Sequence, residues 1–323
     1  MGTDVRRQRP SRPRGVWRLT LGVTLVVAAT TLFLLRAAVL IAAHPAHAAT
    51  LGVLAFVGVV LLVLGIRDLR SSRPLRARRF VVVGRTATGL LVAVVIGAMV
   101  YLIPFSASAG ALAAVGGSPE VRVTSSPTSI TLTPTSGPAD AGLVFQPGAR
   151  VDPRAYLPLL ERVSAGGYLV VIVKQPFEIG FTAIGAPGAV ISAHPEIRRW
   201  AVGGHSLGGV AASSYAEAHA GQVSGLLLWA SYPLGSLAAR TDLAVTSVSG
   251  TSDGLATPAD IEASRSTLPA ATRFVAIEGG VHAYFGDYGA QPGDGTPGVD
   301  RATAQTQVVA ASTTLLGALA TRP

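Results

Sequence analysis

A serine between two glycines is the residue of this sequence best suited to chemistry. Gly204, Ser206 and Gly208 form a Gly-x-Ser-x-Gly pattern that follows the apolar run 200–202 and precedes the Ala-rich run 210–219. In such a pattern a strand turns sharply into a helix, the glycines avoid clashes, and the serine is held clear of the sheet. The helix N-terminus favours negative charge that develops nearby. We therefore predict that Ser206 is a nucleophile.

The pattern alone is weak support, because glycine and serine are abundant in this chain and a second match exists. That match, 250–254, is centred on Ser252. It follows a strand-like run, but the residues after it, 255–258, are typical of a loop rather than a helix. Since a nucleophile turn needs a strand before it and a helix after it, the context favours Ser206 over Ser252.

A nucleophilic serine needs a histidine base, and the base needs a carboxylate that orients it. In hydrolases with this turn the chain order is Ser, acid, His. Two histidines follow Ser206. His219 lies at the end of the same predicted helix, roughly 20 Å away at 1.5 Å per residue. His282 follows the predicted strand 274–277 and a Gly-Gly break, so it lies at the carboxyl end of a strand and is the predicted base.

The acid must also lie at a carboxyl strand end. Asp253 follows the predicted strand 243–248 and a short turn, whereas Asp242 precedes that strand and lies at the opposite edge of the sheet. Asp260 fits better as a helix cap after a proline. We therefore predict Asp253 as the acid and keep Asp287, in the loop after His282, as its rival.

An oxyanion hole needs two backbone N–H groups directed at the tetrahedral oxygen. Leu207 follows the nucleophile and supplies the first. The second comes from the turn Pro147-Gly148-Ala149 after the predicted strand 143–145. We favour Ala149 over Gly148. The alternative is that both segments are ordinary turns.

These residues need a sheet that holds them at one edge. Short apolar runs alternate with helix-like segments along the second part of the chain. The predicted strands are 121–124, 130–133, 143–145, 168–173, 200–202, 223–229, 243–248 and 274–277, and the predicted helices are 152–164, 210–219 and 301–320. Continuous apolar strands between helices indicate a mostly parallel sheet covered on both faces, with its chemistry at the carboxyl strand ends. The predicted class is α/β.

Three long apolar runs, 19–43, 48–66 and 86–105, come before this region. A helix needs roughly 20 apolar residues to cross a bilayer core. The runs show no polar stripe, and the first is too long for a cleaved signal peptide. We therefore predict three transmembrane helices. Arg36 is the only charged residue in the runs, and we interpret it as positioning its helix by reaching the interface or a neighbouring helix.

Charge defines the predicted topology. The first 85 residues have a net charge of +12 and the remaining 238 of −3, which gives the chain +9. Arginines precede the first run and fill the loop between the second and third, so both are predicted to be cytoplasmic and everything after residue 105 extracytoplasmic. The basic segments flank apolar runs and lack interleaved aromatic residues, which excludes nucleic acid and favours anionic lipid headgroups as partner. No protein partner can be inferred.

The predicted organisation is a basic cytoplasmic tail (1–18), a three-span region (19–105), a Gly/Ala/Ser-rich linker (106–119) and one α/β domain (120–323). Charged residues are only 13% of the chain, about half the usual share, which excludes intrinsic disorder. The absence of cysteine excludes disulfides, thiol catalysis and cysteine-ligated metals.

Other features have ordinary explanations. Lys174 at a strand end is interpreted as a surface lysine rather than a contact for an acidic substrate. Asp287 and Asp294 share a loop rich in Gly and Pro, but their spacing is not that of a calcium loop.

Residues 140–323 resemble the alpha/beta hydrolase superfamily. The turn around Ser206, the Pro-Gly pair at 147–148, and the segments 250–253 and 280–282 follow one another in that family's order. The stretch 281–295 resembles a bacterial branch akin to dienelactone hydrolases, whose members are often membrane-anchored. The resemblance implies the alpha/beta-hydrolase fold and a Ser-His-Asp hydrolase without metal or cofactor. Only a short stretch separates residues 173 and 200, which leaves little room for a lid domain.

The sequence thus predicts a membrane-anchored, extracytoplasmic serine hydrolase that cleaves an ester or thioester through an acyl-enzyme. Two alternatives remain open. One is an acyltransferase with the same triad and an envelope lipid or sugar as acceptor. The other is a non-catalytic hydrolase-like membrane module. The substrate itself does not follow from the residues.

Overall fold

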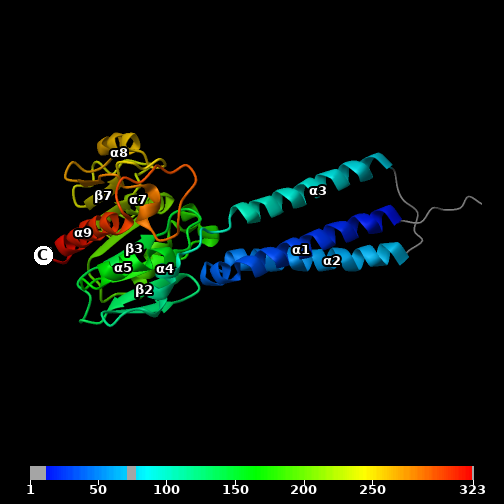
Figure 1. The fold of residues 1–323 in the computed structure, drawn as a ribbon, viewed down its shortest axis with the longest axis horizontal. Helices are drawn as coiled ribbons and strands as arrows, with labels where there is room; N and C mark the ends of the chain where they lie inside the picture. The colour runs from blue at the N-terminus through cyan, green and yellow to red at the C-terminus, as the bar shows by residue number, and fades with distance from the viewer. Residues whose placement is uncertain (1–11, 71–77, 322–323) are drawn as a thin grey trace, which may run out of the picture. The chain divides into compact units, whose positions relative to one another are not determined.

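A computed structural model of the chain describes residues 12–70 and 78–321 (Figure 1). The chain divides into two compact units, a helical unit of Met1–Ile41 with Ala46–Ile103 and an α/β unit of Ala42–Pro45 with Pro104–Pro323. Residues 1–11 of the predicted basic tail and residues 71–77 of the predicted arginine-rich loop lie outside the described residues.

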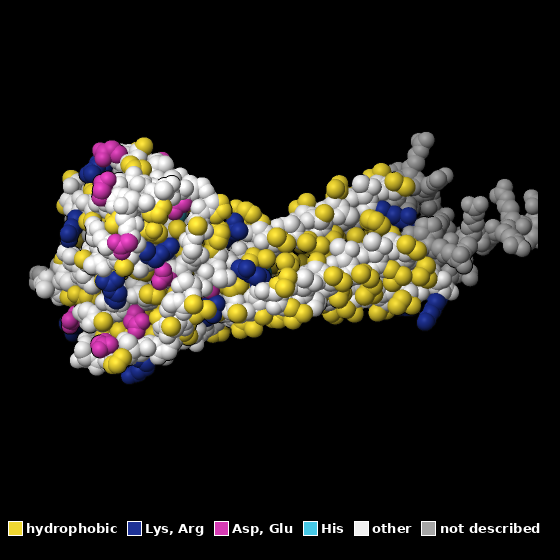
Figure 2. Space-filling view, in the orientation of Figure 1, with side chains coloured by type: hydrophobic (Ala, Val, Ile, Leu, Met, Phe, Trp, Pro, Cys, Tyr) yellow, Lys and Arg dark blue, Asp and Glu magenta, His cyan; other side chains and the backbone are white. Residues whose placement is uncertain are grey.

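Three helices make up the described part of the first unit: α1 (Arg12–Ala42), α2 (Ala46–Arg70) and α3 (Arg78–Tyr101). Each is long and apolar enough to cross a membrane, and Figure 2 shows hydrophobic side chains along their visible surface. The predicted spans fall on them. The third helix ends earlier than predicted, because Pro104 disfavours helical geometry in the residue before it. Arg36 has non-helical dihedral angles and marks a kink in α1.

Glycines bring the backbones of α1 and α2 close together. A Cβ added to Gly22 would lie 2.7 Å from the carbonyl oxygen of Gly58, and one added to Gly15 would lie 2.9 Å from that of Gly65. Small residues that permit such close approach are a common basis of helix packing in membranes. Arg18 Nη1 and Asp68 Oδ2, 2.9 Å apart, add an ion pair between the same two helices.

The α/β unit is built on a sheet of eight strands in the order β1-β2-β4-β3-β5-β6-β7-β8. The strands are β1 (Val121–Ser125), β2 (Ser129–Pro134), β3 (Gly142–Gln146), β4 (Leu169–Val173), β5 (Trp200–His205), β6 (Gly225–Trp229), β7 (Ala244–Gly250) and β8 (Arg273–Ile277). β1 and β2 pair antiparallel with each other, and β2 pairs antiparallel with β4. All other pairs are parallel. The predicted mostly parallel sheet is confirmed.

Helices cover both faces of the sheet. They are α4 (Ala109–Ala113), α5 (Leu157–Ser164), α6 (Ala186–Ala193), α7 (Leu207–Ala218), α8 (Pro258–Ser264) and α9 (Arg301–Ala320). Leu143 and Phe145 of β3 pack in one core with side chains of α5 and α9. Val144, between them, packs in a second core with α7. Alternate side chains of a strand point to opposite faces, so both faces are apolar and both are covered.

Two segments differ from the sequence expectations. The predicted helix 152–164 opens with a 3-10 turn, Pro153–Tyr156, and becomes α5 at Leu157. Pro158 explains the change, because it has no N–H to donate to the carbonyl four residues back. The predicted linker 106–119 contains α4, and Ala111 of that helix is fully buried in the domain core. The segment therefore packs into the domain through Ala111.

Candidate active site

The turn between β5 and α7 holds Ser206 in a strained conformation. Ser206 has φ 52° and ψ −126°, a region that costs a non-glycine residue of order 1–3 kcal/mol. Its carbonyl oxygen accepts hydrogen bonds from the N–H of Gly209 and from Ser231 Oγ, at 2.9 and 2.7 Å. α7 begins directly after the serine, at Leu207, three residues earlier than predicted. The serine therefore lies where a strand meets the positive end of a helix.

The two glycines of the pattern are required by a close crossing of the chain. A Cβ on Gly204 or on Gly208 would collide with the carbonyl oxygen of Gln146 at the end of β3, and one on Gly208 would also collide with that of Pro147. These neighbours are backbone atoms, which cannot move aside as a flexible side chain does. The turn around Ser206 and the turn after β3 are thus packed against each other.

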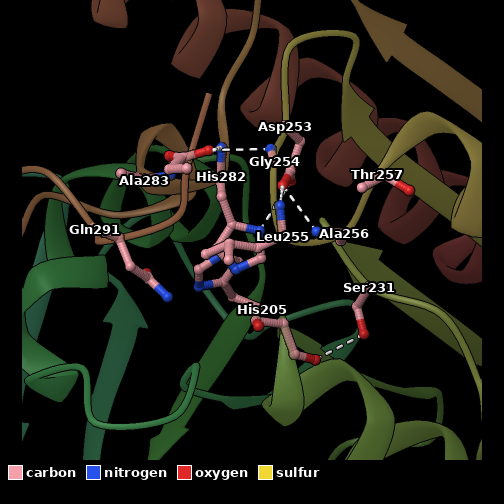
Figure 3. Close-up of polar contacts among 12 residues, drawn as sticks. His205, Ser231, Asp253, Gly254, Leu255, Ala256, Thr257, His282, Ala283 and Gln291 are labelled. Carbon is pink, nitrogen blue, oxygen red and sulfur yellow. Dashed lines mark hydrogen bonds and ion pairs between the residues drawn. The ribbon is translucent and has the colours of Figure 1, made fainter. Parts of the chain in front are cut away.

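His282 and Asp253 form a buried pair. His282 Nδ1 lies 2.8 Å from Asp253 Oδ2 (Figure 3), and both side chains are almost inaccessible to solvent. The other carboxylate oxygen, Oδ1, accepts hydrogen bonds from the N–H groups of Leu255 and Ala256, each at 2.8 Å. The ionised carboxylate fixes the proton on Nδ1, which leaves Nε2 as the basic nitrogen. Nε2 is buried and has no hydrogen-bond partner among the described residues.

The ring of His282 lies next to the serine turn. Its centroid is 4.5 Å from that of His205, the residue before Ser206. Among the described residues, Ser206 Oγ and His282 Nε2 are not hydrogen-bonded to each other. Catalytic hydrogen bonds are often long without substrate and tighten when it binds. The geometry therefore brings the predicted nucleophile, base and acid to one edge of the sheet.

The rival residues have other contacts. His219 donates from Nδ1 to the Tyr215 carbonyl at the far end of α7. Asp287 Oδ1 lies 3.6 Å from Arg301 Nη1. Ser252 donates its N–H to the carbonyl of Gly280 in a turn of the backbone.

Backbone N–H groups near Ser206 differ in whether they have an acceptor. Gly148 donates to Tyr156 Oη at 2.8 Å, and Arg150 donates to the Glu178 carbonyl at 2.8 Å. Between them, the N–H of Ala149 has no acceptor within the described parts of the chain, and the same holds for Leu207. The N–H of Gly148 is thus already bonded to Tyr156. The two N–H groups that remain free to bind an oxyanion are those of Ala149 and Leu207.

Tyr156 and His205 are site residues that the sequence analysis missed. Tyr156 Oη lies 2.9 Å from His205 Nδ1, and both side chains are fully buried. Burial raises the pKa of Tyr156 well above its usual value. Burial, and next the proximity of His282, lower the pKa of His205 well below its usual value, so His205 is neutral. No local pattern pointed to Tyr156, because it lies in a helical segment 49 residues before its partner.

Replacing Tyr156 with phenylalanine is expected to lower kcat/KM about 5- to 100-fold. The change leaves the buried Gly148 N–H without an acceptor and His205 Nδ1 without a partner. The turn before Ala149 and the ring before Ser206 can then shift, and a misplacement of catalytic groups by 1 Å lowers rates by about 100-fold. Ester hydrolysis by the full-length protein measures the effect. The matched control is Tyr168→Phe, since Tyr168 Oη makes no hydrogen bond within the described residues. Equal kcat/KM values for the two variants would contradict the role of Tyr156.

Glu178, whose carbonyl accepts the Arg150 N–H, is a buried carboxyl next to the turn after β3. Burial raises the pKa of Glu178 from 4.5 to about 8. Between these pH values the folded protein binds a proton that the unfolded chain has released, so stability falls as pH rises. We expect a slope of roughly 1 kcal/mol per pH unit in this window. Thermal unfolding of Glu178→Gln should be correspondingly less pH-dependent, whereas the exposed Glu262→Gln should unfold like the wild type.

Lys174 differs from the expectation of a surface lysine. It is 5% exposed. Its Nζ donates to Ser125 Oγ at 2.9 Å and to the Ser126 carbonyl at 2.7 Å. These bonds tie the end of β4 to the turn between β1 and β2, so the lysine is structural.

Three features define an alpha/beta-hydrolase fold. They are a mostly parallel sheet, a strained serine at the turn between β5 and α7, and a buried Asp-His pair after β7 and β8. The chain belongs to the alpha/beta hydrolase family: residues 142–307, just over half of its length, match the model of the "Alpha/beta hydrolase family". Family and fold support a hydrolase.

Two solved structures are similar to the chain at a low level. One is of a proposed dienelactone hydrolase from Klebsiella pneumoniae subsp. pneumoniae MGH 78578. It has 20% identity and a TM-score of 0.46, over 60% of this chain and 98% of its own. The other is of a monoacylglycerol lipase from Paleococcus ferrophilus. It has 13% identity and a TM-score of 0.44, over 59% of this chain and 99% of its own. No curated protein sequence matches the chain.

Proposed function

We propose that the protein is a membrane-anchored serine hydrolase that cleaves an ester or thioester through an acyl-enzyme. The observation that carries the proposal is the buried pair of His282 and Asp253 beside the strained turn that holds Ser206. The second ring nitrogen of His282 has no hydrogen-bond partner within residues 12–70 and 78–321. A nucleophile, a base and an orienting carboxylate are the three parts that acyl transfer by a serine requires.

In the proposed reaction, Ser206 Oγ attacks the acyl carbon while His282 Nε2 takes its proton. The N–H groups of Leu207 and Ala149 stabilise the oxyanion of the tetrahedral intermediate. The bond to the leaving alcohol or thiol then breaks, and His282 returns the proton to it. Water repeats the cycle and releases the acid. Asp253 keeps the imidazole oriented and stabilises its protonated form, and neutral His205 adds no second positive charge beside it.

The same acyl-enzyme could pass its acyl group to an alcohol instead of water. Product analysis of the full-length protein in detergent, with p-nitrophenyl butyrate and with or without an added alcohol, separates the two. A hydrolase releases butyrate in both cases. A butyryl ester formed in preference to butyrate would assign an acyltransferase. If the wild-type protein shows no saturable release of p-nitrophenol above that of the Ser206→Ala variant, both the hydrolase and the acyltransferase are contradicted. The remaining alternative is then a non-catalytic membrane module.

The proposal places the α/β domain outside the cytoplasmic membrane. It is supported by three helices that could cross a bilayer and by the arginines that flank the first helix and separate the second from the third. Anionic headgroups are the proposed partners of these arginines. A reporter that is active only outside the cytoplasm should be active when it is fused after residue 323. Activity of a reporter that works only in the cytoplasm would overturn this placement.

A further inference from the structure

Asp294 contacts the two loops that carry the Asp-His pair. It lies between His282 and α9. Its Oδ1 accepts hydrogen bonds from the N–H of His282 at 3.0 Å and of Gly254 at 3.4 Å, and its Oδ2 accepts one from the N–H of Ala283 at 2.8 Å. The N–H of Gly295 adds a fourth donor, at 2.8 Å. The carboxylate therefore joins the loop after β7 to the segment after β8.

The turn that contains Asp294 is packed directly on the turn that contains Asp253. A Cβ on Gly254 would lie 2.5 Å from the carbonyl oxygen of Gly293, and one on Gly295 would collide with that of Ser252. Only glycines allow this approach of the two backbones. The packing is independent of the hydrogen bonds and fixes the same two turns relative to each other.

The contacts of Asp294 differ from those expected of a metal ligand or a catalytic group. Its oxygens face four backbone N–H donors, and the hydrogen bond between Asp253 and His282 is made without it. The interaction of Asp294 is with the N–H of the residue that carries the base, and with the residues immediately after the acid and the base. Any effect on the reaction must pass through the position of these two side chains.

We propose that Asp294 is a positioning residue of the acid–base pair. It holds the loop of Asp253 and the segment of His282 together, so that Nδ1 and Oδ2 stay at the 2.8 Å that orients the base. The inference rests on the proposed function, because the pair must be catalytic for its position to affect a rate. Small misplacements of catalytic groups lower rates strongly, by about 100-fold for 1 Å.

The test compares Asp294→Ala, Asp294→Asn and Asp300→Ala in the full-length protein, with a short soluble ester as substrate. We expect kcat of Asp294→Ala to fall about 10- to 100-fold with KM changed less than about threefold. Asp294→Asn retains one acceptor oxygen and should recover part of the loss. Asp300 is the matched control: its carboxylate also accepts a backbone N–H, from Thr303, at the start of α9. Asp300→Ala should keep the wild-type kcat.

A double-mutant comparison separates positioning from general destabilisation. If Asp294 acts through the pair, Asp294→Ala should lower kcat less than about threefold when Asp253 is already alanine, because coupled residues are not additive. An equal loss in both backgrounds, or an unchanged kcat in the single variant, would overturn the proposal. If Asp294→Ala does not fold, the same comparison with Asp294→Asn decides it. An inactive wild-type protein would instead contradict the proposed function.

Discussion

Replacement of His282 with alanine is expected to lower kcat by roughly 10⁵- to 10⁶-fold, the loss that follows removal of the general base from a serine triad. Within residues 12–70 and 78–321, the imidazole of His282 is the only group with one nitrogen fixed by a buried carboxylate and the other nitrogen free beside the serine turn. Without it Ser206 stays a neutral alcohol, which is a poor nucleophile. Single-turnover kinetics with p-nitrophenyl butyrate measure the change in the acylation rate.

His219→Ala is the matched control for this variant. His219 is the other histidine that follows Ser206 in the sequence, and its ring packs on Tyr215 at the end of α7. We expect its loss to affect stability by about 1 kcal/mol and kcat by little. A His282→Ala protein that is folded and retains more than one hundredth of the wild-type kcat would contradict the assignment of the base.

Replacement of Gly208 with alanine is the second large effect that we expect. The new Cβ would collide with two backbone carbonyl oxygens, of Gln146 and Pro147. Relief requires the turn of Ser206 and the turn after β3 to move apart, at a cost of about 3 kcal/mol or more of stability. The same movement separates the N–H groups of Leu207 and Ala149. We therefore expect kcat/KM to fall at least about 100-fold even at temperatures where the protein is folded.

Gly185→Ala is the control for a glycine in open space. Gly185 precedes α6 with negative φ, and a Cβ there meets nothing within 4 Å. Thermal unfolding and ester hydrolysis of both variants, measured together, test the steric argument. Wild-type stability of Gly208→Ala would show that the two turns are less tightly packed than described.

Much of the fold followed from local pattern. Each predicted strand overlaps an observed one. β3, β4, β5 and β6 are buried along their whole length, and strands buried on both faces are continuous apolar runs. The order of strands also explains why Asp253 and His282 meet: they follow β7 and β8, which pair in parallel. Carboxyl ends of paired parallel strands lie at the same edge, so the contact could be anticipated from chain order.

Residues that support the pair could not be predicted in this way. Tyr156 reaches His205 from a helical segment far earlier in the chain, and Asp294 binds backbone N–H groups of loops whose paths no sequence pattern defines. The short helices α4 and α6 were missed for a different reason. Their small, apolar residues lack the spacing that identifies a longer helix, and each helix buries only one residue, Ala111 in α4 and Pro187 in α6.

Covalent labelling of the full-length protein with a fluorophosphonate probe tests the central claim most directly, because the probe reacts only with a serine that its site activates. Mass spectrometry of the labelled peptides identifies the residue. The account predicts a single adduct on Ser206, absent from Ser206→Ala and unchanged in Ser252→Ala, the serine of the second Gly-x-Ser-x-Gly match. A folded wild-type protein that takes up no probe, or a Ser206→Ala protein that is still labelled, would contradict it.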